Sequence, residues 1–145
     1  MGRVVKFTVP GVPIGKGRPR VASRGGHARM YTPEKTAAYE GLVAHAGRVA
    51  MAGAAPIEGG CSVVLDVCLP VPESWSKKKQ AAALAGQVLA TKKPDTDNVI
   101  KAIFDGLNAV AWRDDVQVVR VTTQKRYGAT PGVAVQITEL EGVEA

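Results

Sequence analysis

Hydrophobic and polar residues alternate, or β-branched residues concentrate, along four short stretches of this chain, as in β-strands that bury one face. In the first stretch Val5, Phe7 and Val9 are apolar, the residues between them are polar, and Pro10 ends the pattern. The second stretch is rich in β-branched residues and stops at two prolines. We therefore predict strands over residues 3–9, 61–69, 116–123 and 133–140.

Between these strands, apolar residues recur at the spacing of α-helices. The clearest stripe consists of Val99, Ile103, Leu107 and Val110, which fall on one face of a helix. Polar residues line another face of the same segment. We predict helices over about 33–51, 74–90 and 98–110.

Two of these helices have recognisable start signals. Thr32 offers an N-cap oxygen, Pro33 suits the first helical position, and Glu34 favours the positive end of the helix dipole. Asp97 is the natural N-cap of the helix predicted over 98–110.

The order strand, helix, strand, helix, helix, strand, strand predicts an α+β fold in which about three helices pack on a mixed sheet of about four strands. At 145 residues, the chain is expected to form a single domain spanning 1–145. Residues 10–32 are rich in Gly, Pro and Arg and have no clear period, so we expect a functional loop there. Residues 139–145 are expected to form a flexible tail.

The formal net charge is +6, and no signal-peptide pattern or membrane-length apolar run is seen, so we expect a cytoplasmic protein with no membrane contact. Cys61 and Cys68 share one predicted strand, where they would lie roughly 23 Å apart. We therefore expect two reduced, packed thiols that form neither a disulfide nor a zinc site.

The positive charge is concentrated near the N-terminus, because no acidic residue precedes Glu34. A basic, glycine-containing loop can follow the phosphates of a nucleic acid with little base specificity. The alternative is a solvated, flexible loop. The candidate DNA-binding residues are Lys16, Arg18, Arg20, Arg24 and Arg29.

The acidic residues show the opposite clustering. Five of the thirteen lie between positions 95 and 115, namely Asp95, Asp97, Asp105, Asp114 and Asp115. Such a cluster would repel a polyanion unless divalent cations lie between them, and Mg²⁺ prefers oxygen ligands of this kind. The alternative is that these residues are helix caps and solvated turn residues. A shared metal site would require Asp114 or Asp115 to return to the start of the helix through the tertiary fold.

The spacing of these residues resembles the signature of RusA-type Holliday junction resolvases. The matching residues are Pro94, Asp95, Thr96, Asp97, Asn98, Lys101, Phe104, Asp105, Leu107, Trp112, Asp114, Asp115, Val116, Gln117, Val118 and Val119. The likeness is best in the C-terminal half, and the long Gly/Arg loop resembles phage and prophage members. The 16–29 segment is longer and differently composed than in the best-known members.

The resemblance implies a RusA-like fold and a homodimeric endonuclease of bacterial or phage origin that nicks two strands of a four-way DNA junction symmetrically. It implies that Asp95, Asp97 and Asp115 are essential acids that bind Mg²⁺, with Mn²⁺ as a substitute, and that Lys101 is the essential lysine. Without the resemblance, Lys101 reads as an ordinary helix-surface partner of Asp97 or Asp105. Two further functions stay open: a nuclease for other branched or flap nucleic acids, and a non-catalytic nucleic-acid-binding module.

Overall fold

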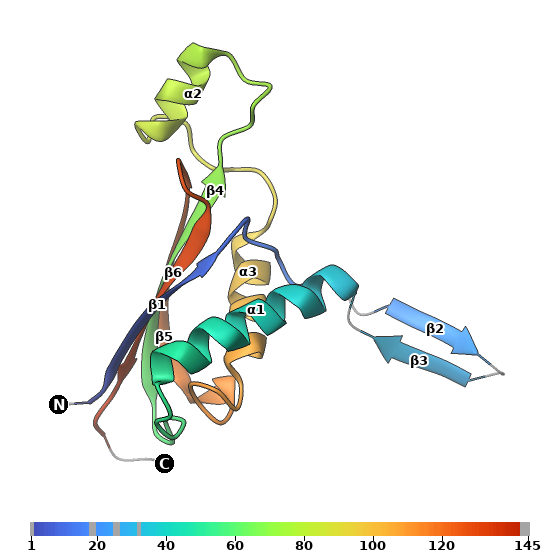
Figure 1. Cartoon of the computed structure of the whole chain (residues 1–145), viewed down its shortest axis with the longest axis vertical. Helices are drawn as coiled ribbons and strands as arrows, with labels where there is room; N and C mark the ends of the chain where they lie inside the picture. The colour runs from blue at the N-terminus through green and yellow to red at the C-terminus, as the bar shows by residue number, and fades with distance from the viewer. Residues whose placement is uncertain (1, 18–19, 25–26, 32, 143–145) are drawn as a thin grey trace.

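The computed structural model describes residues 2–17, 20–24, 27–31 and 33–142. In chain order the elements are β1 (Val4–Pro10), β2 (Arg20–Arg24), β3 (His27–Tyr31), α1 (Glu34–Met51), β4 (Cys61–Pro70), α2 (Lys77–Leu84), α3 (Thr96–Leu107), a short 3₁₀ helix η1 (Asp115–Gln117), β5 (Val118–Gly128) and β6 (Gly132–Glu139). Figure 1 shows α1 and α3 on one side of a long sheet, with α2 beyond one end of it.

The main sheet has the strand order β1-β6-β4-β5 within the described chain. Strand β4 pairs in parallel with β5 and antiparallel with β6, and β1 pairs antiparallel with β6. The predicted α+β class with a mixed four-stranded sheet and three helices is therefore confirmed.

Strand β5 is longer than its sequence predicts. The predicted strand over 116–123 ends at Thr123, but pairing with β4 continues to the pair Pro70↔Gly128. Because β5 is an edge strand, its polar residues can stay in the ladder while they contact solvent on the unpaired side. The polar composition after Thr123, which led the sequence to predict too short a strand, thus reflects the position of β5 at the edge of the sheet.

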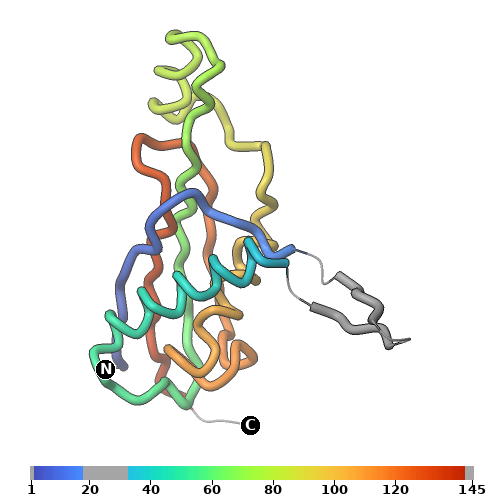
Figure 2. The backbone as a smooth tube through the Cα atoms, turned by 45° about the vertical axis from the view of Figure 1, so that its right-hand side comes forward, coloured from blue at the N-terminus to red at the C-terminus, as the bar shows by residue number. Residues whose placement is uncertain are grey.

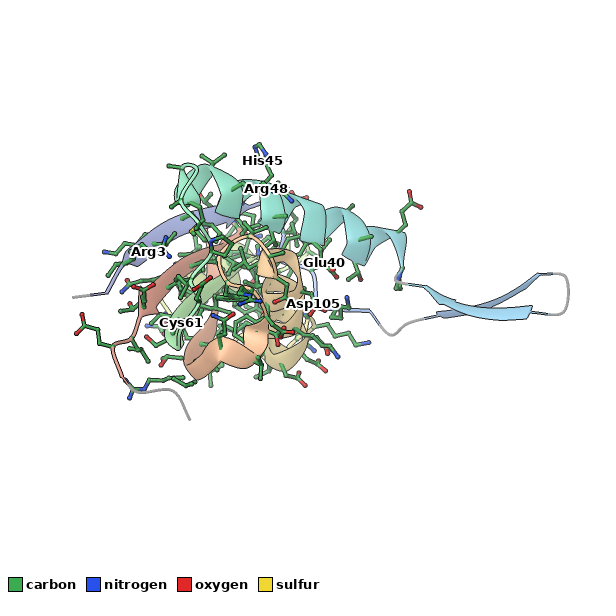
Figure 3. The ribbon with its side chains drawn as sticks, turned by 90° about the horizontal axis from the view of Figure 1, so that it is seen from below. Arg3, Glu40, His45, Arg48, Cys61 and Asp105 are labelled. Carbon is green, nitrogen blue, oxygen red and sulfur yellow. The ribbon has the colours of Figure 1, made fainter. Side chains whose placement is uncertain are left out.

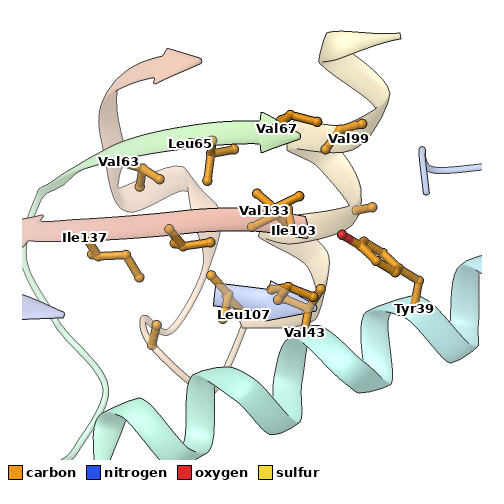
Figure 4. Close-up of a cluster of buried hydrophobic side chains, with 14 of the residues drawn as sticks. Tyr39, Val43, Val63, Leu65, Val67, Val99, Ile103, Leu107, Val133 and Ile137 are labelled. Carbon is orange, nitrogen blue, oxygen red and sulfur yellow. The ribbon is translucent and has the colours of Figure 1, made fainter. Parts of the chain in front are cut away.

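The core lies between the sheet and the pair of helices α1 and α3 (Figure 4). Val43 of α1, Leu107 of α3 and Leu65 of β4 are all buried there. The two helices approach closely because glycines lie at their contact: a Cβ added to Gly106 would lie 2.8 Å from the Cβ of Val43. Val99, Ile103 and Leu107 of the predicted stripe therefore lie on the buried face of α3, while Val110 is buried beyond the end of the helix.

Helix boundaries differ from the predicted ones in all three helices, and α3 ends at Leu107, before the predicted residue 110. Helix α1 begins at Glu34, with Pro33 at the N-cap position instead of the first helical position, and Thr32 lies outside the described residues. Helix α3 begins at Thr96 with Asp95 at the N-cap, so Asp97 belongs to the first turn and does not cap the helix. Helix α2 ends at Leu84, before Gly86 adopts a φ of 80°, and is shorter than the predicted 74–90.

Part of the expected loop over 10–32 is a β-hairpin. Strands β2 and β3 form a separate antiparallel sheet, with Arg20 opposite Tyr31 and Arg24 opposite His27. In Figure 1 this hairpin extends away from the main sheet and its helices. Each of these strands has only five residues and lies within a stretch rich in Gly, Pro and Arg, so it lacks the long apolar-polar alternation by which strands are recognised, which explains why the sequence predicted a loop.

The expected tail is anchored over its first residues. The backbone N–H of Glu139 donates to the carbonyl of Arg3 (2.8 Å), and that of Leu140 donates to the carbonyl of Gly60 (2.9 Å). A flexible tail from 139 is therefore wrong for these two residues, while 143–145 lie outside the described part of the chain.

Both cysteines are free and buried, as predicted. Burial, with a smaller contribution from the charge of Glu139, raises the pKa of the Cys61 thiol to about 11. Within the described residues, no helix combines the length and apolar character needed to cross a membrane.

Candidate metal and nucleic-acid site

Two carboxylates at the start of α3 have no partner among the residues that the structure describes. Asp95 occupies the N-cap position, but its side chain accepts no capping hydrogen bond. Asp97 follows in the first turn, and both residues are exposed. Among the described residues neither carboxylate has a hydrogen bond or an ion pair, so the interpretation of Asp95 as a simple helix cap is wrong. Their oxygens are available to an outside ligand.

Lys101 lies one helical turn after Asp97, and its side chain is exposed. The expected surface pair with Asp97 or Asp105 is not formed within the described residues, because Asp105 bonds to Lys16 instead, at 3.0 Å. The ammonium of Lys101 is thus also available at the surface near the two acids.

Asp114 and Asp115 lie at the other end of α3. The Asp114 carboxylate accepts from the backbone N–H of Val116 (3.1 Å) in a capping box that begins η1. The Asp115 carboxylate accepts from the side-chain amide of Asn108, the C-cap residue of α3, at 3.4 Å. For Asp114 the alternative of a structural turn residue is therefore correct.

The three expected ligands do not meet within one chain. Helix α3 has 12 residues, which gives it a length of about 18 Å between the two groups of acids. At the level of Asp95, the neighbouring residue of β5 is Lys125, whose ammonium bonds to the carbonyl of Pro94. No group of three or more His, Cys, Asp or Glu side chains in the described part of the chain is placed to hold a metal ion. The return of Asp114 or Asp115 to the start of α3, which a shared metal site within one chain would require, is therefore not seen among the described residues.

A pocket of about 380 Å³ opens beside Asp95. Its lining residues are Pro13, Ile14, Gly15, Lys16, Lys93, Pro94, Asp95 and Asn98. One wall belongs to the segment before the hairpin, and the other belongs to the start of α3. Gly15 permits their close approach, since a Cβ at this position would lie 3.0 Å from the Cβ of Asn98. The backbone N–H of Lys16 also donates to the carbonyl of Asn98 (2.8 Å).

Lys16 forms ion pairs with two acidic residues, and the sequence did not predict either pair. Its ammonium lies 2.7 Å from Glu40 of α1 and 3.0 Å from Asp105 of α3, and only 14% of its side chain is exposed. Figure 3 shows Glu40 and Asp105 close together between the two helices. Burial lowers the pKa of Lys16, but the hydrogen bonds to the two carboxylates outweigh it and the net shift is upward. Lys16 thus joins the loop to both helices and is not the exposed phosphate contact that we expected.

The remaining candidate DNA-binding residues belong to the hairpin region. The register pairs Ala22 with Arg29 and Arg24 with His27, and residues directly opposite in a ladder share a face. Arg20, Arg24 and Arg29 are therefore placed on one face of the ribbon, and Arg18 lies outside the described residues. This common face was not evident from the sequence, because it depends on the pairing.

The base of the hairpin adjoins the candidate site. Gly17, which directly follows the pocket-lining Lys16, donates its backbone N–H to the hydroxyl of Thr36 in α1 (3.0 Å). The chain returns to the body at Pro33, and a Cβ on Gly17 would lie 3.0 Å from the Cγ of Pro33. The hairpin therefore begins and ends at one place beside the start of α3.

Comparisons of the sequence with known proteins identify the family of this chain. A protein of Bacillus subtilis (strain 168), described as uncharacterized protein YqaN, is 39% identical over 141 residues, covering 94% of this chain and 96% of that protein. The family model described as endodeoxyribonuclease RusA matches residues 10–138, which include the hairpin, the pocket and the five aspartates between positions 95 and 115. The chain thus belongs to the RusA family of endodeoxyribonucleases.

Proposed function

We propose that this protein is a Mg²⁺-dependent, structure-selective endodeoxyribonuclease that resolves four-way DNA junctions by paired symmetric nicks. The observation that carries the proposal is the pair of unpartnered, exposed carboxylates of Asp95 and Asp97 at the start of α3. Membership of an endodeoxyribonuclease family gives this pair its chemical context.

The donor set fits Mg²⁺. This ion is commonly bound through one or two carboxylates, several waters and substrate phosphate oxygens, without a complete protein cage. Asp95 and Asp97 would hold it, and the pocket beside Asp95 leaves room for the substrate. When bound, the ion neutralises charge on the phosphodiester and lowers the pKa of a coordinated water.

The residues around the acids support binding of a polyanion. Lys101 and Lys93 are exposed near the pocket and the start of α3, and the hairpin carries arginines on one face. Lys101 would stabilise the charge that develops on the phosphate as the bond to the leaving oxygen breaks. The hairpin would hold a DNA arm through its phosphates, an interaction that weakens steeply with salt.

Asp115 stays a prediction of the resemblance. Asp115 lies at the opposite end of α3 from Asp95. Its substitution tests whether it acts apart from the ion held by Asp95 and Asp97 or helps to bind that ion. If Asp115→Asn abolishes nicking but leaves Mg²⁺ binding unchanged, Asp115 acts apart from the ion held by Asp95 and Asp97. If it weakens Mg²⁺ binding as much as Asp97→Asn does, Asp115 reaches the same ion in the assembled enzyme.

A homodimer would suit the substrate. A two-fold pair places two identical sites on strands of like polarity, as symmetric nicking of a junction requires. Light scattering at the concentration used for cleavage should give twice the mass of one chain. A monomer that still makes paired nicks would contradict this part of the proposal.

One cleavage assay tests the proposed activity. Labelled four-way junction, flap and linear duplex DNA are incubated with Mg²⁺ or EDTA and with wild-type protein, Asp95→Asn, Asp97→Asn or Lys101→Ala. Glu58→Gln is the matched control, because it removes one exposed carboxylate that has no role in the proposed site. We expect paired nicks at the junction that require Mg²⁺ and are lost in the three site variants but not in the control.

Two other outcomes would favour the alternatives. Cleavage of flaps in preference to junctions would indicate a nuclease for other branched nucleic acids. Junction binding without cleavage under Mg²⁺ and Mn²⁺ would indicate a non-catalytic binding module.

A further inference from the structure

We propose that Lys125 is a positioning residue that fixes the backbone before Asp95 and thereby sets the geometry in which Asp95 and Asp97 bind a divalent cation. The inference rests on the proposed function of these two acids. Lys125 belongs to β5, at the level where this strand passes the start of α3.

The contacts of Lys125 are short and directed at one segment. Its ammonium donates to the carbonyl oxygen of Lys92 at 2.7 Å and to that of Pro94 at 2.9 Å. These carbonyls belong to the residues three positions and one position before Asp95. A charged donor makes stronger hydrogen bonds than a neutral one, so the pair forms a firm attachment.

The segment has few other means of being held in place. Figure 2 shows it descending from α2 to α3 as an irregular stretch of chain. Within the described residues, Lys92, Lys93 and Pro94 make no backbone-to-backbone hydrogen bond, and they belong to no helix or strand. The Lys125 ammonium therefore connects this stretch to the rigid sheet.

The attachment bears directly on the acids. Pro94 and Asp95 are consecutive, and both line the pocket beside the start of α3. The Asp95 carboxylate has no capping bond to hold it, so its direction depends on the backbone that carries it. Groups that orient metal ligands from outside the coordination shell typically contribute about 10–100-fold in metal affinity or activity.

A contact between Lys125 and DNA is the competing explanation, and the two have different consequences. Loss of a phosphate contact would weaken junction binding and lower the dependence of log affinity on log salt by about 0.9. Loss of positioning would weaken cation binding in the absence of DNA and leave that salt dependence unchanged.

The test measures Mn²⁺ binding to DNA-free protein by calorimetry and, separately, nicking as a function of Mg²⁺ concentration. Lys125→Met keeps the length of the side chain but removes its donors, and Lys125→Gln keeps an uncharged donor. Lys92→Met is the matched control, because it removes a nearby exposed charge and retains the carbonyl that Lys125 binds. Thermal melting of each variant establishes that it is folded.

We expect Lys125→Met to bind Mn²⁺ about tenfold more weakly than Lys92→Met and to need correspondingly more Mg²⁺ for half-maximal nicking. Lys125→Gln should lie between wild type and Lys125→Met, and it replaces Lys125→Met in the comparison if the latter does not fold. Mn²⁺ affinities of Lys125→Met and Lys92→Met within twofold of each other would overturn the inference. If wild-type protein binds Mn²⁺ but cleaves no DNA, the proposed nuclease function fails while the Mn²⁺ comparison still decides the role of Lys125.

Discussion

Asp95 occupies a position where an aspartate ordinarily stabilises a helix, yet its carboxylate makes no capping bond. Asp114 shows the contrast within the same chain, because its carboxylate caps η1 through the N–H of Val116. At the residue scale, the two aspartates therefore differ in one interaction: the Asp114 carboxylate accepts a capping hydrogen bond, and the Asp95 carboxylate does not.

This difference predicts how substitution of the α3 acids separates stability from activity. Asp95→Asn and Asp97→Asn remove only a dipole interaction at a helix start, so each should change the free energy of unfolding by no more than about 1 kcal/mol. Nicking should fall by about 100-fold or more, since each substitution removes a proposed metal ligand. Urea unfolding and single-turnover cleavage measure the two effects. A large loss of stability with nearly normal cleavage would show that the two acids are structural residues and not metal ligands.

Cys61 should make stability sensitive to alkaline pH. Its pKa is raised from 9.0 to about 11 in the fold, mainly by burial, so the unfolded thiol ionises first as pH rises. The stability contribution of Cys61 is complete below pH 9.0 and declines between pH 9.0 and about 11. Urea midpoints measured from pH 8 to 10.5 should fall more steeply for wild type than for Cys61→Val, and parallel curves would contradict the prediction.

At the scale of elements, the contact between α1 and α3 depends on glycine. A Cβ on Gly106 would lie 2.8 Å from Val43 and 2.9 Å from the carbonyl of Glu40, whereas one on Gly41 would meet nothing within 4 Å. Gly106→Ala should therefore destabilise the protein by about 1–3 kcal/mol through overpacking, despite the better helix propensity of alanine. Gly41→Ala should stabilise it by about 0.5–1 kcal/mol. Denaturant unfolding of both variants checks this, and equal effects would show that the helices can move apart without cost.

The hairpin can be removed as a unit because its two ends adjoin at Gly17 and Pro33. Replacing 18–32 by two glycines should leave the melting temperature nearly unchanged. The slope of log affinity for DNA against log salt should decrease by about 3 to 4, at about 0.9 for each of four lost arginine contacts. Fluorescence anisotropy across a salt series measures this slope.

A full-length variant with Arg18, Arg20, Arg24 and Arg29 changed to serine is the matched control for the hairpin deletion. If the slope decreases equally in this variant and in the hairpin deletion, the decrease results from loss of the arginine charges alone. A slope identical to that of wild type in both variants would show that the hairpin does not contact DNA phosphates.

At the scale of the whole molecule, a cation bound by the folded protein but not by the unfolded chain stabilises the entire fold. At a Mg²⁺ concentration ten times its Kd, this linkage gives about 1.4 kcal/mol. We expect wild type to gain this stability, whereas the Asp95→Asn, Asp97→Asn double variant should not. Thermal melting at constant ionic strength measures the gain. An equal gain in both proteins would place the cation elsewhere.

The chain direction in the sheet explains why one expected ligand is distant. Strand β5 runs back alongside α3, so η1 and Asp115 lie near the end of that helix while Lys125 reaches its start. The acids are close in sequence only because a single helix and a short turn connect them. The distance between the acids at the two ends of α3 depends on the topology, and the spacing of the residues in the sequence does not predict it.

Much of the fold followed from local patterns alone. The apolar stripe of α3, the alternation in β1 and the β-branched run in β4 each have a period that reports one buried face. The boundaries and the hairpin were predicted less well, because capping position and strand pairing depend on neighbouring segments. The same local signals identified Asp95 and Asp97 as candidate site residues.

The sequence by itself determined the buried faces, the fold class and the family signature, since these depend on residue spacing within elements and on the order of elements along the chain. Only the tertiary structure decided which charges meet. In the fold, the Lys16 ammonium binds both Glu40 and Asp105, and the Lys125 ammonium binds the carbonyl of Pro94 next to Asp95. Asp115 lies at the opposite end of α3 from Asp95. The physical reason is that contacts between distant residues depend on strand order and chain direction, which no local period encodes.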